Sequence, residues 1–249
     1  MYRQEEEIQE ARYQRWRAER WVRTYVEELP EILWAGDFRS GRLARLAERR
    51  ELLRVSAYGY VEPPPREWPR WRRRRYVDRA RARAVALSIP ETCAVGGPHA
   101  ALLHGLPVLY VPPVVEVHGE SFPSTVRPRR DYRRVVREGV TRDVDVVEGM
   151  RVTNLDRTVI ECARRLPLDG ALVVADAALN KSVWPDPKQR SEGDRAAAAA
   201  RVRWQKLLAG EPGRRGNKRA RLVLEMVDGW AESPLESRMR RALLAIGLP

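Results

Sequence analysis

The stretch 38–61 (FRSGRLARLAERRELLRVSAYGYV) limits the possible folds most strongly, because a short basic helix pattern runs directly into a two-stranded ribbon pattern. Ser40 is a plausible N-cap for a helix over about residues 41–51. In this helix three arginines share one face and three apolar residues lie on another, namely Arg42, Arg45 and Arg49 against Leu43, Leu46 and Ala47. One face can therefore pack on a small core while the other presents guanidinium groups.

The residues that follow this helix alternate between apolar and polar side chains, which is typical of a half-buried strand. Gly59 permits a tight turn or a bulge, so two strands can pair. A basic helix followed by a basic ribbon is the layout of a winged helix-turn-helix, whose second helix enters the DNA major groove while the ribbon, the wing, contacts the DNA backbone or minor groove. An ordinary amphipathic helix with a solvated arginine face explains the pattern equally well.

The charge balance of the chain also favours an anionic partner. Its 249 residues carry a formal net charge of +13, with 47 Lys and Arg against 34 Asp and Glu. Arginine predominates, and its planar guanidinium suits the bidentate recognition of phosphate. A high-GC coding bias would explain the choice of Arg over Lys, but it leaves the net excess unexplained. Nucleic acid is the commonest partner of so basic a chain.

Other features of the sequence indicate a cytoplasmic protein. Cys93 and Cys162 have neither a short pairing nor a metal-binding spacing, so we expect free thiols in a reducing compartment. The first sixteen residues form a charged helix pattern that is unlike a signal peptide. The longest apolar run, Ala171–Leu179, contains Asp176, so we expect no membrane partner.

We expect no enzyme, cofactor or metal from the chemistry-bearing residues. Three histidines without a cysteine or carboxylate cluster make a poor metal site. Asp143 and Asp145 could hold Mg²⁺, but a strand with Val144 and Val146 inward and both aspartates outward is the simpler interpretation. The chain also lacks a glycine-rich phosphate loop, a nucleophile elbow and a Ser/His/Asp arrangement.

Three runs in the middle of the chain carry a resemblance to a known family: RARAVALSIPETCAVGGPHAALLHGLPVL (81–109), VVEVHGE (114–120) and EGMRVTNLDRTVIECARRLPLDGALVVADAALNKS (148–182). In order and spacing they resemble the AbiEi-type antitoxins of type IV toxin–antitoxin systems. That family also carries an N-terminal winged helix with an end similar to residues 53–61. The resemblance covers about residues 29–228. It implies a sequence-specific DNA-binding protein that represses its own promoter, and a nucleotidyltransferase-like toxin as a possible partner.

The tail AESPLESRMRRALLAIGLP (231–249) is similar to the first helix of very-short-patch-repair-like endonuclease domains. In that resemblance Glu236 would be the leading acidic residue of the nuclease site. The carboxylates and the lysine that would follow are not in this chain, so we expect a truncated, inactive start of such a domain. The alternative role of Glu236 is the N3 position of a capping box that begins at Ser233.

These observations predict an α+β fold: an N-terminal winged helix-turn-helix, a mixed α/β domain and a helical C-terminal region. The expected segments are an N-terminal helix with the winged helix-turn-helix, a proline- and arginine-rich linker, the AbiEi-like α/β domain, a helical region and the nuclease-like start, at 1–62, 63–79, 80–182, 183–230 and 231–249. The linker covers most of an arginine run directly behind the predicted wing.

The predicted function is a DNA-binding antitoxin and transcriptional autorepressor that acts on double-stranded DNA at its own promoter, with a homodimer as one candidate form on DNA. Two alternatives are a truncated antitoxin–endonuclease fusion and a toxin-binding interaction module. The predicted DNA-contacting residues come from the basic helix and its edges, from the wing and from the arginine run: Arg39, Arg42, Arg45, Arg49, Arg50, Arg54, Tyr58, Arg72, Arg73, Arg74 and Arg75.

Overall fold

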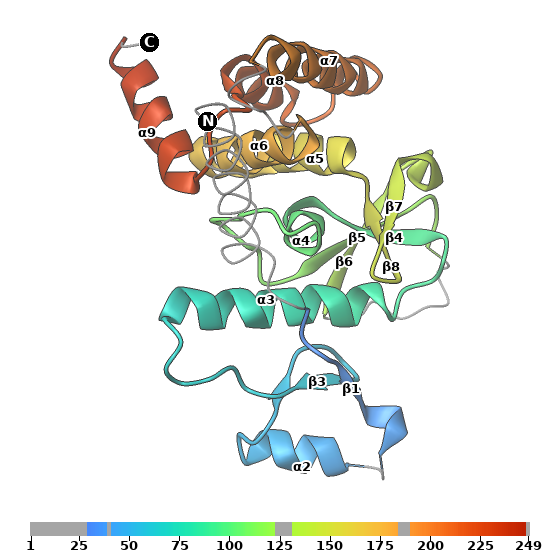
Figure 1. Ribbon diagram of the computed structural model, residues 1–249. Coiled ribbons are helices and arrows are strands. Elements are labelled where there is room, and N and C mark those ends of the chain that lie inside the picture. Colours follow the sequence, from blue (N-terminus) through green and yellow to red (C-terminus); the bar gives the residue numbers. More distant parts are fainter. Residues whose placement is uncertain (1–28, 39–40, 123–130, 184–189, 248–249) are drawn as a thin grey trace, which may run out of the picture.

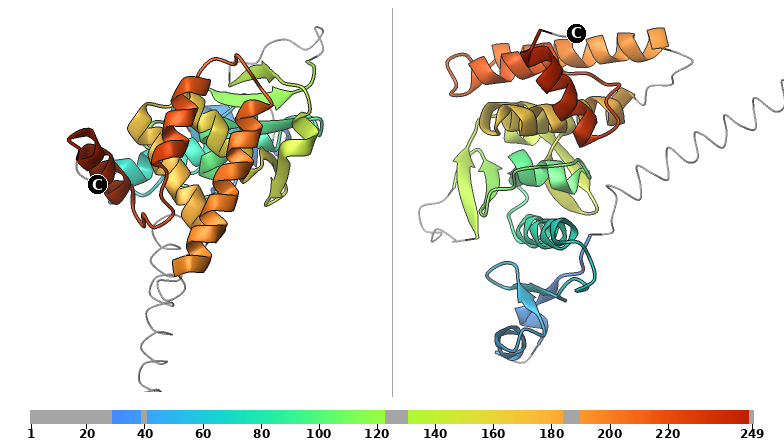
Figure 2. Two further views of the ribbon diagram at one scale, coloured as in Figure 1. Left: turned by 90° about the horizontal axis from the view of Figure 1, so that it is seen from above. Right: turned by 90° about the vertical axis from the view of Figure 1, so that its left-hand side faces the viewer.

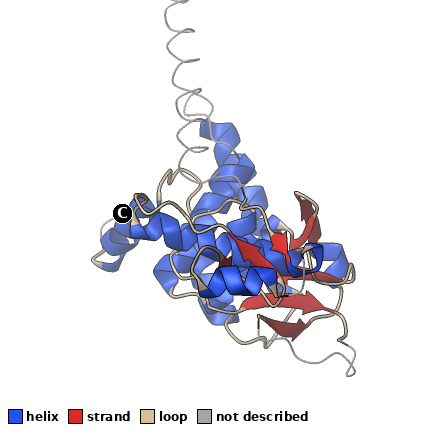
Figure 3. Cartoon of the chain, turned by 90° about the horizontal axis from the view of Figure 1, so that it is seen from below, coloured by secondary structure: helices blue, strands red, loops and turns tan. Residues whose placement is uncertain are grey.

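The fold is of the α+β class, as the sequence predicts, and its elements are arranged in layers (Figure 1). The computed structural model describes residues 29–38, 41–122, 131–183 and 190–247. A small three-stranded sheet and helix α2 lie at one end, followed by α3, a five-stranded sheet with α4, the pair α5 and α6, and the pair α7 and α8 (Figures 1 and 2). Figure 3 shows the strands gathered toward one side of the molecule and the helices mostly toward the other.

The N-terminal unit consists of β1 (Leu33–Trp34), η1 (Ala35–Asp37), α2 (Arg42–Glu48), β2 (Leu53–Arg54) and β3 (Gly59–Val61). Its three strands are antiparallel in the order β1-β3-β2. Helix α2 is shorter than the predicted 41–51, and the N-cap is Gly41 at φ +73° instead of Ser40, which lies outside the described residues. A positive φ suits glycine at this position, because a Cβ would be strained there.

The turn between β2 and β3 is held by local hydrogen bonds and by one contact with the rest of the molecule. The Gly59 amide donates to Ser56 Oγ at 2.9 Å. The Ala57 amide donates to Asp131 Oδ2 at 3.1 Å, just before the strand β6 (Tyr132–Val136). The ribbon is therefore anchored to the central part of the chain at its turn.

Helix α3 (Arg70–Ala86) joins the N-terminal unit to the central sheet. The residues before it, 62–69, form neither helix nor strand, as the proline-rich sequence predicts. Ala80 and Ala84 pack with the apolar residues of the N-terminal unit, whereas Ala82 and Val85 pack with those of the central sheet. The expected division between residues 79 and 80 falls inside this helix, so α3 contributes to the cores on both sides.

The central sheet is mixed and has the strand order β6-β5-β4-β8-β7. Strand β4 lies antiparallel to β5 and parallel to β8, while β6 is parallel to β5 and β7 antiparallel to β8. Helix α4 follows β4 directly and covers residues 97–103, for which the sequence predicts a helix. The elements are β4 (Cys93–Gly96), α4 (Gly97–Leu103), β5 (Val115–Gly119), β6, η2 (Val140–Asp143), β7 (Val144–Val147) and β8 (Met150–Thr153).

Five helices complete the chain: α5 (Leu155–Arg165), α6 (Leu168–Val183), α7 (Arg190–Ala209), α8 (Asn217–Met226) and α9 (Pro234–Ala245). The apolar faces of α5, α6, α7 and α8 form the largest core, which includes Ile160 and Trp204. None of the helices in the described part of the chain is both long and apolar enough to cross a membrane.

Two predicted helix caps have different outcomes. The Thr153–Asp156 spacing predicts a capping box for α5 that begins at Thr153, and this prediction is wrong, because the N-cap is Asn154, whose side chain accepts from the Arg157 amide at 2.9 Å. The Ser233–Glu236 capping box of α9 is confirmed, because Ser233 Oγ accepts from the Glu236 amide at 3.3 Å while Glu236 accepts from the Glu232 amide at 2.7 Å. The Glu236 carboxylate therefore has a capping role at the start of α9.

Candidate functional site

The exposed face of α2 is the basic surface that the sequence predicts. Arg42, Arg45 and Arg49 are all exposed, and none of them forms an ion pair with the acidic residues that the structure describes. On the opposite side Leu43 is buried and packs with Leu52 and Tyr60. The division into an apolar and a basic face is confirmed, and the three guanidinium groups are accessible to a ligand.

The other residues near α2 that were predicted to contact DNA differ in their exposure and in their contacts. Arg39 lies outside the described residues, and Arg50 is exposed just after the helix at φ +63°. Arg54 folds back on the ribbon turn, where it donates to the carbonyl oxygens of Ser56 at 3.2 Å and Ala57 at 2.7 Å. Tyr58, at the same turn, is 60% exposed. Arg54 thus supports the turn, whereas Tyr58 projects from it.

The arginine run 72–75 belongs to α3 and not to an extended linker. The Arg72 guanidinium lies 3.9 Å from the centre of the Trp68 ring, a cation–π contact, and Arg74 is 3.8 Å from Asp78. The three-stranded sheet lies between α2 and α3 (Figures 1 and 2). The predicted basic residues therefore fall into two groups, one on α2 and its ribbon and one on α3.

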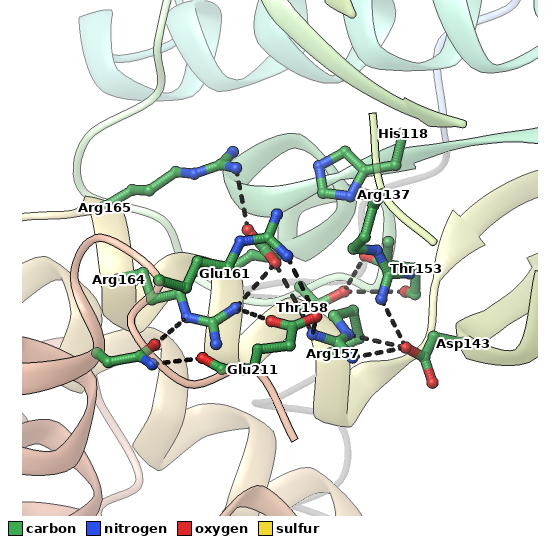
Figure 4. Close-up of polar contacts among 12 residues, drawn as sticks. His118, Arg137, Asp143, Thr153, Arg157, Thr158, Glu161, Arg164, Arg165 and Glu211 are labelled. Atoms are coloured by element: carbon green, nitrogen blue, oxygen red, sulfur yellow. Dashed lines mark hydrogen bonds and ion pairs between the residues drawn. The ribbon is translucent and has the colours of Figure 1, made fainter. Parts of the chain in front are cut away.

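A buried ionic network between the sheet and α5 was not predicted from the sequence (Figure 4). Its centre is Glu161 on α5, which is fully buried. The Glu161 carboxylate lies 3.0 Å from Arg165 and 3.4 Å from Arg164. Arg165 also contacts Glu116 on β5, so the network connects the helix to the sheet. Removing one partner of a buried ion pair strongly destabilises the folded protein, because an uncompensated charge remains.

The network continues to Asp143, whose predicted position is wrong. Asp143 lies in η2 rather than on an outward strand face, and it accepts from Arg137 at 2.7 Å and from Arg157 at 2.9 Å. Val146, expected to point inward, is 66% exposed on the edge strand β7. Burial alone would raise the pKa of Asp143, but the hydrogen bonds and charges of the two arginines together lower it. Asp143 is therefore a charged partner within the network.

His118 stands beside this network without taking part in its hydrogen bonds. Its ring is fully buried, and among the described residues neither ring nitrogen has a hydrogen-bond partner. Nε2 lies 3.8 Å from a Glu116 carboxylate oxygen, too far for a hydrogen bond. Burial lowers the pKa of His118 to about 4, although the Glu161 charge acts in the opposite direction. The ring is thus neutral at physiological pH.

The glycine pair in the sequence AVGGPH makes room for these buried groups. A Cβ at Gly96 would lie 2.7 Å from two carbon atoms of the His118 ring, and one at Gly97, where φ is +59°, would lie 3.1 Å from Glu116 Oε2. One sequence signal for the network was available: Arg157, Glu161 and Arg165 follow one another at four-residue spacing on α5. The sequence interpretation used only the apolar residues of this helix.

The two remaining histidines, His99 and His104, lie buried inside the fold. His104 Nε2 lies 2.7 Å from the Thr153 carbonyl oxygen, in agreement with the packing role expected around residues 96–105. His99 is fully buried. In the described ranges, no group of three or more His, Cys, Asp or Glu side chains could hold a metal ion.

Comparison with known proteins finds related chains but no characterised one. The chain is 33% identical over 124 residues to "Uncharacterized protein MT2308" of Mycobacterium tuberculosis (strain CDC 1551 / Oshkosh) and to "Uncharacterized protein Rv2248" of Mycobacterium tuberculosis (strain ATCC 25618 / H37Rv). In both cases the match covers 50% of this chain and 40% of the relative. No protein-family profile and no solved structure matches the chain.

Proposed function

We propose that this chain is a DNA-binding transcriptional regulator of the antitoxin type, with α2 entering the major groove and the β2–β3 ribbon acting as a wing. The observation that carries the proposal is the face of α2, on which Arg42, Arg45 and Arg49 are exposed and have no ion pair within the described residues. A helix that presents several unpaired arginines from a packed support suits phosphate and base-edge recognition.

The order of the elements around α2 supports the same proposal. The short helix is followed by two antiparallel strands, and the first strand β1 pairs with the second strand of the ribbon. In a winged helix-turn-helix the recognition helix precedes such a ribbon. Tyr58 at the ribbon turn is exposed and would lie near the DNA backbone, whereas Arg54 would act by supporting the turn.

The net charge supports an anionic partner, and the resemblance of the central runs supports the choice of regulator. A formal charge of +13 attracts DNA over several ångströms and makes binding dependent on salt. The AbiEi-type resemblance further suggests repression of its own promoter and a nucleotidyltransferase-like toxin as a protein partner. Co-purification of the neighbouring gene product with this chain tests the second part.

Fluorescence anisotropy with the DNA directly upstream of the gene tests DNA binding. A scrambled duplex of the same length is the control, and each duplex is titrated at several salt concentrations. If about five phosphates are contacted, log K should fall against log salt with a slope of about −4 to −5. Equal, weak binding of both duplexes, or a flat salt dependence, would contradict the proposal.

Arg45→Ala separates the α2 surface from the general basic charge of the chain. A matched control is Arg221→Ala on α8, since Arg221 is also exposed. Both variants lose one positive charge, but only Arg45 lies on the proposed recognition face. We expect the affinity of Arg45→Ala for the upstream duplex to fall by about tenfold or more, corresponding to roughly 1–3 kcal/mol for a base contact. Equal losses in the two variants would refute a specific role of α2.

A further inference from the structure

A charged cleft lies on the opposite side of the central sheet from the α2 surface, next to the buried ionic network. Its volume is about 710 Å³, within the usual range for small-molecule sites. The loop that leads from β6 into η2 forms one wall, and the end of α7 with the following loop forms the other. The cleft is thus built from segments about 70 residues apart in the sequence.

Arg137 supplies the strongest indication of a ligand at this cleft. Its side chain is 3% exposed and is held by one ion pair, from Nη1 to Asp143 at 2.7 Å. Nε and Nη2 are also buried, but no acceptor for them is present among the described residues. Buried guanidinium nitrogens are almost always hydrogen-bonded in native proteins. Arg137 lines the cleft, so these two donors lie next to the space that a ligand would enter.

Two further cations at the cleft are open to a ligand. Arg142 and Lys206 are exposed on its opposite walls, and neither forms an ion pair in the described part of the chain. The inner acidic residues are already paired: Asp143 forms ion pairs with Arg137 and Arg157, and Glu211 forms ion pairs with Arg157, Arg164 and Arg214. Burial alone would raise the pKa of Glu211, but these arginines lower it.

We propose that this cleft binds a small phosphate-bearing molecule, with Arg137 at the base and Arg142 and Lys206 at the two walls. A phosphate group offers several acceptor oxygens to convergent cations, which matches the donors that remain free. The two exposed acidic residues that also line the cleft, Glu120 and Glu138, disfavour a general polyanion surface. Because Arg137 is deeply buried, a small ligand reaches it more readily than a phosphate fixed in a DNA duplex.

Isothermal titration calorimetry with sodium pyrophosphate tests this site. Sodium chloride at the same ionic strength is the reference titrant. The test variant is Arg142→Gln/Lys206→Gln, which changes two exposed side chains of the cleft and should leave the fold intact. The matched control is Arg221→Gln/Lys218→Gln on α8, which removes the same two types of charge outside the cleft. Arg137→Gln, checked for folding by circular dichroism, tests the buried donor.

We expect saturable pyrophosphate binding by the unaltered protein and by the control variant. The affinity of the cleft variant should be at least about tenfold lower, as for the loss of charge-assisted hydrogen bonds. Absence of binding, or equal affinity in both double variants, would overturn the proposal. DNA binding is measured in parallel: if the cleft variant loses more DNA affinity than the control variant, the cleft is part of the DNA surface and the small-ligand site is refuted. Failure of DNA binding alone would leave the pyrophosphate result unaffected.

Discussion

Gly96→Ala is the substitution that tests most directly how tightly the buried network is packed. Gly96 ends β4 with φ −125° and ψ 176°, a conformation that alanine adopts without strain. The new Cβ would lie 2.7 Å from His118 Cδ2 and from Cε1, and closer still to Nε2. Carbon atoms in contact normally stay about 3.5–4.0 Å apart. The backbone tolerates alanine here, so any loss of stability comes from the contact with the ring.

The magnitude depends on whether the ring can move. His118 is fully buried, and Glu116 and Glu161 stand beside it, so its displacement would disturb the ionic network. Overpacking a rigid core costs about 1–3 kcal/mol. Replacing glycine by alanine stabilises the folded protein by about 0.4–1 kcal/mol, because it reduces the conformational entropy of the unfolded chain. We expect Gly96→Ala to lower the free energy of unfolding by about 1–2 kcal/mol, measured by urea denaturation followed by circular dichroism.

Gly170→Ala is the matched control for this argument. A Cβ at Gly170 would lie 2.6 Å from Tyr110 Cδ2, a contact of similar closeness, but Tyr110 is 45% exposed and can turn away. Gly170 also lies within α6, where alanine is favoured by roughly 1 kcal/mol. We therefore expect Gly170→Ala to be neutral or stabilising. In a His118→Ala background the penalty of Gly96→Ala should disappear. Equal effects of the two glycine substitutions, or an unchanged penalty without the ring, would refute the reasoning.

Two further predictions concern buried titratable groups. Burial lowers the pKa values of His99 and His118 from 6.5 to about 4, so the folded state binds fewer protons than the unfolded state between these values. The two neutral rings contribute fully to the free energy of unfolding above pH 6.5. This contribution decreases toward pH 4, by up to roughly 3 kcal/mol for each ring. Ring titration by nuclear magnetic resonance and urea unfolding at stepped pH measure this, and a histidine that titrates near 6.5 would contradict it. Burial raises the pKa values of the Cys93 and Cys162 thiols, so we expect a thiol reagent to label them only after unfolding; rapid labelling of the folded protein would show an open thiol.

The sequence predicts helices and strands well where a periodic pattern is clear. Helix α4 covers the expected residues 97–103. Helix α9 begins with the expected capping box, because Ser233 Oγ accepts from the Glu236 amide and donates to the Glu236 carboxylate. The start of α5 is predicted less well, since Thr153 and Asn154 are both good N-cap residues. Thr153 instead shares a hydrogen bond of 2.7 Å with Thr158. Which of two adjacent caps is used depends on tertiary contacts that a local pattern does not contain.

The position of α3 shows the same limit at the level of domains. The sequence interpretation places a boundary between residues 79 and 80, where the proline- and arginine-rich linker meets the AbiEi-like region. The backbone continues through this point because arginine and alanine are both good helix formers. Ala80 and Ala84 then face the N-terminal unit, while Ala82 and Val85 face the central sheet. The expected boundary thus falls inside a continuous helix whose two faces pack against different cores.

The α2 surface and the ionic network differ in how far their contacts extend along the chain. The exposed arginines of α2 follow from the periodicity of one helix, so a short segment suffices to predict them. Glu161 pairs with Arg164 and Arg165 of its own helix, and Arg164 extends the network to Glu211, about fifty residues further along the chain. In sequence, Arg157, Glu161 and Arg165 resemble the ion-pair ladder of a solvated helix. Whether such a ladder faces water or the core is decided by what packs on it, and here β5 and the α7–α8 loop bury it.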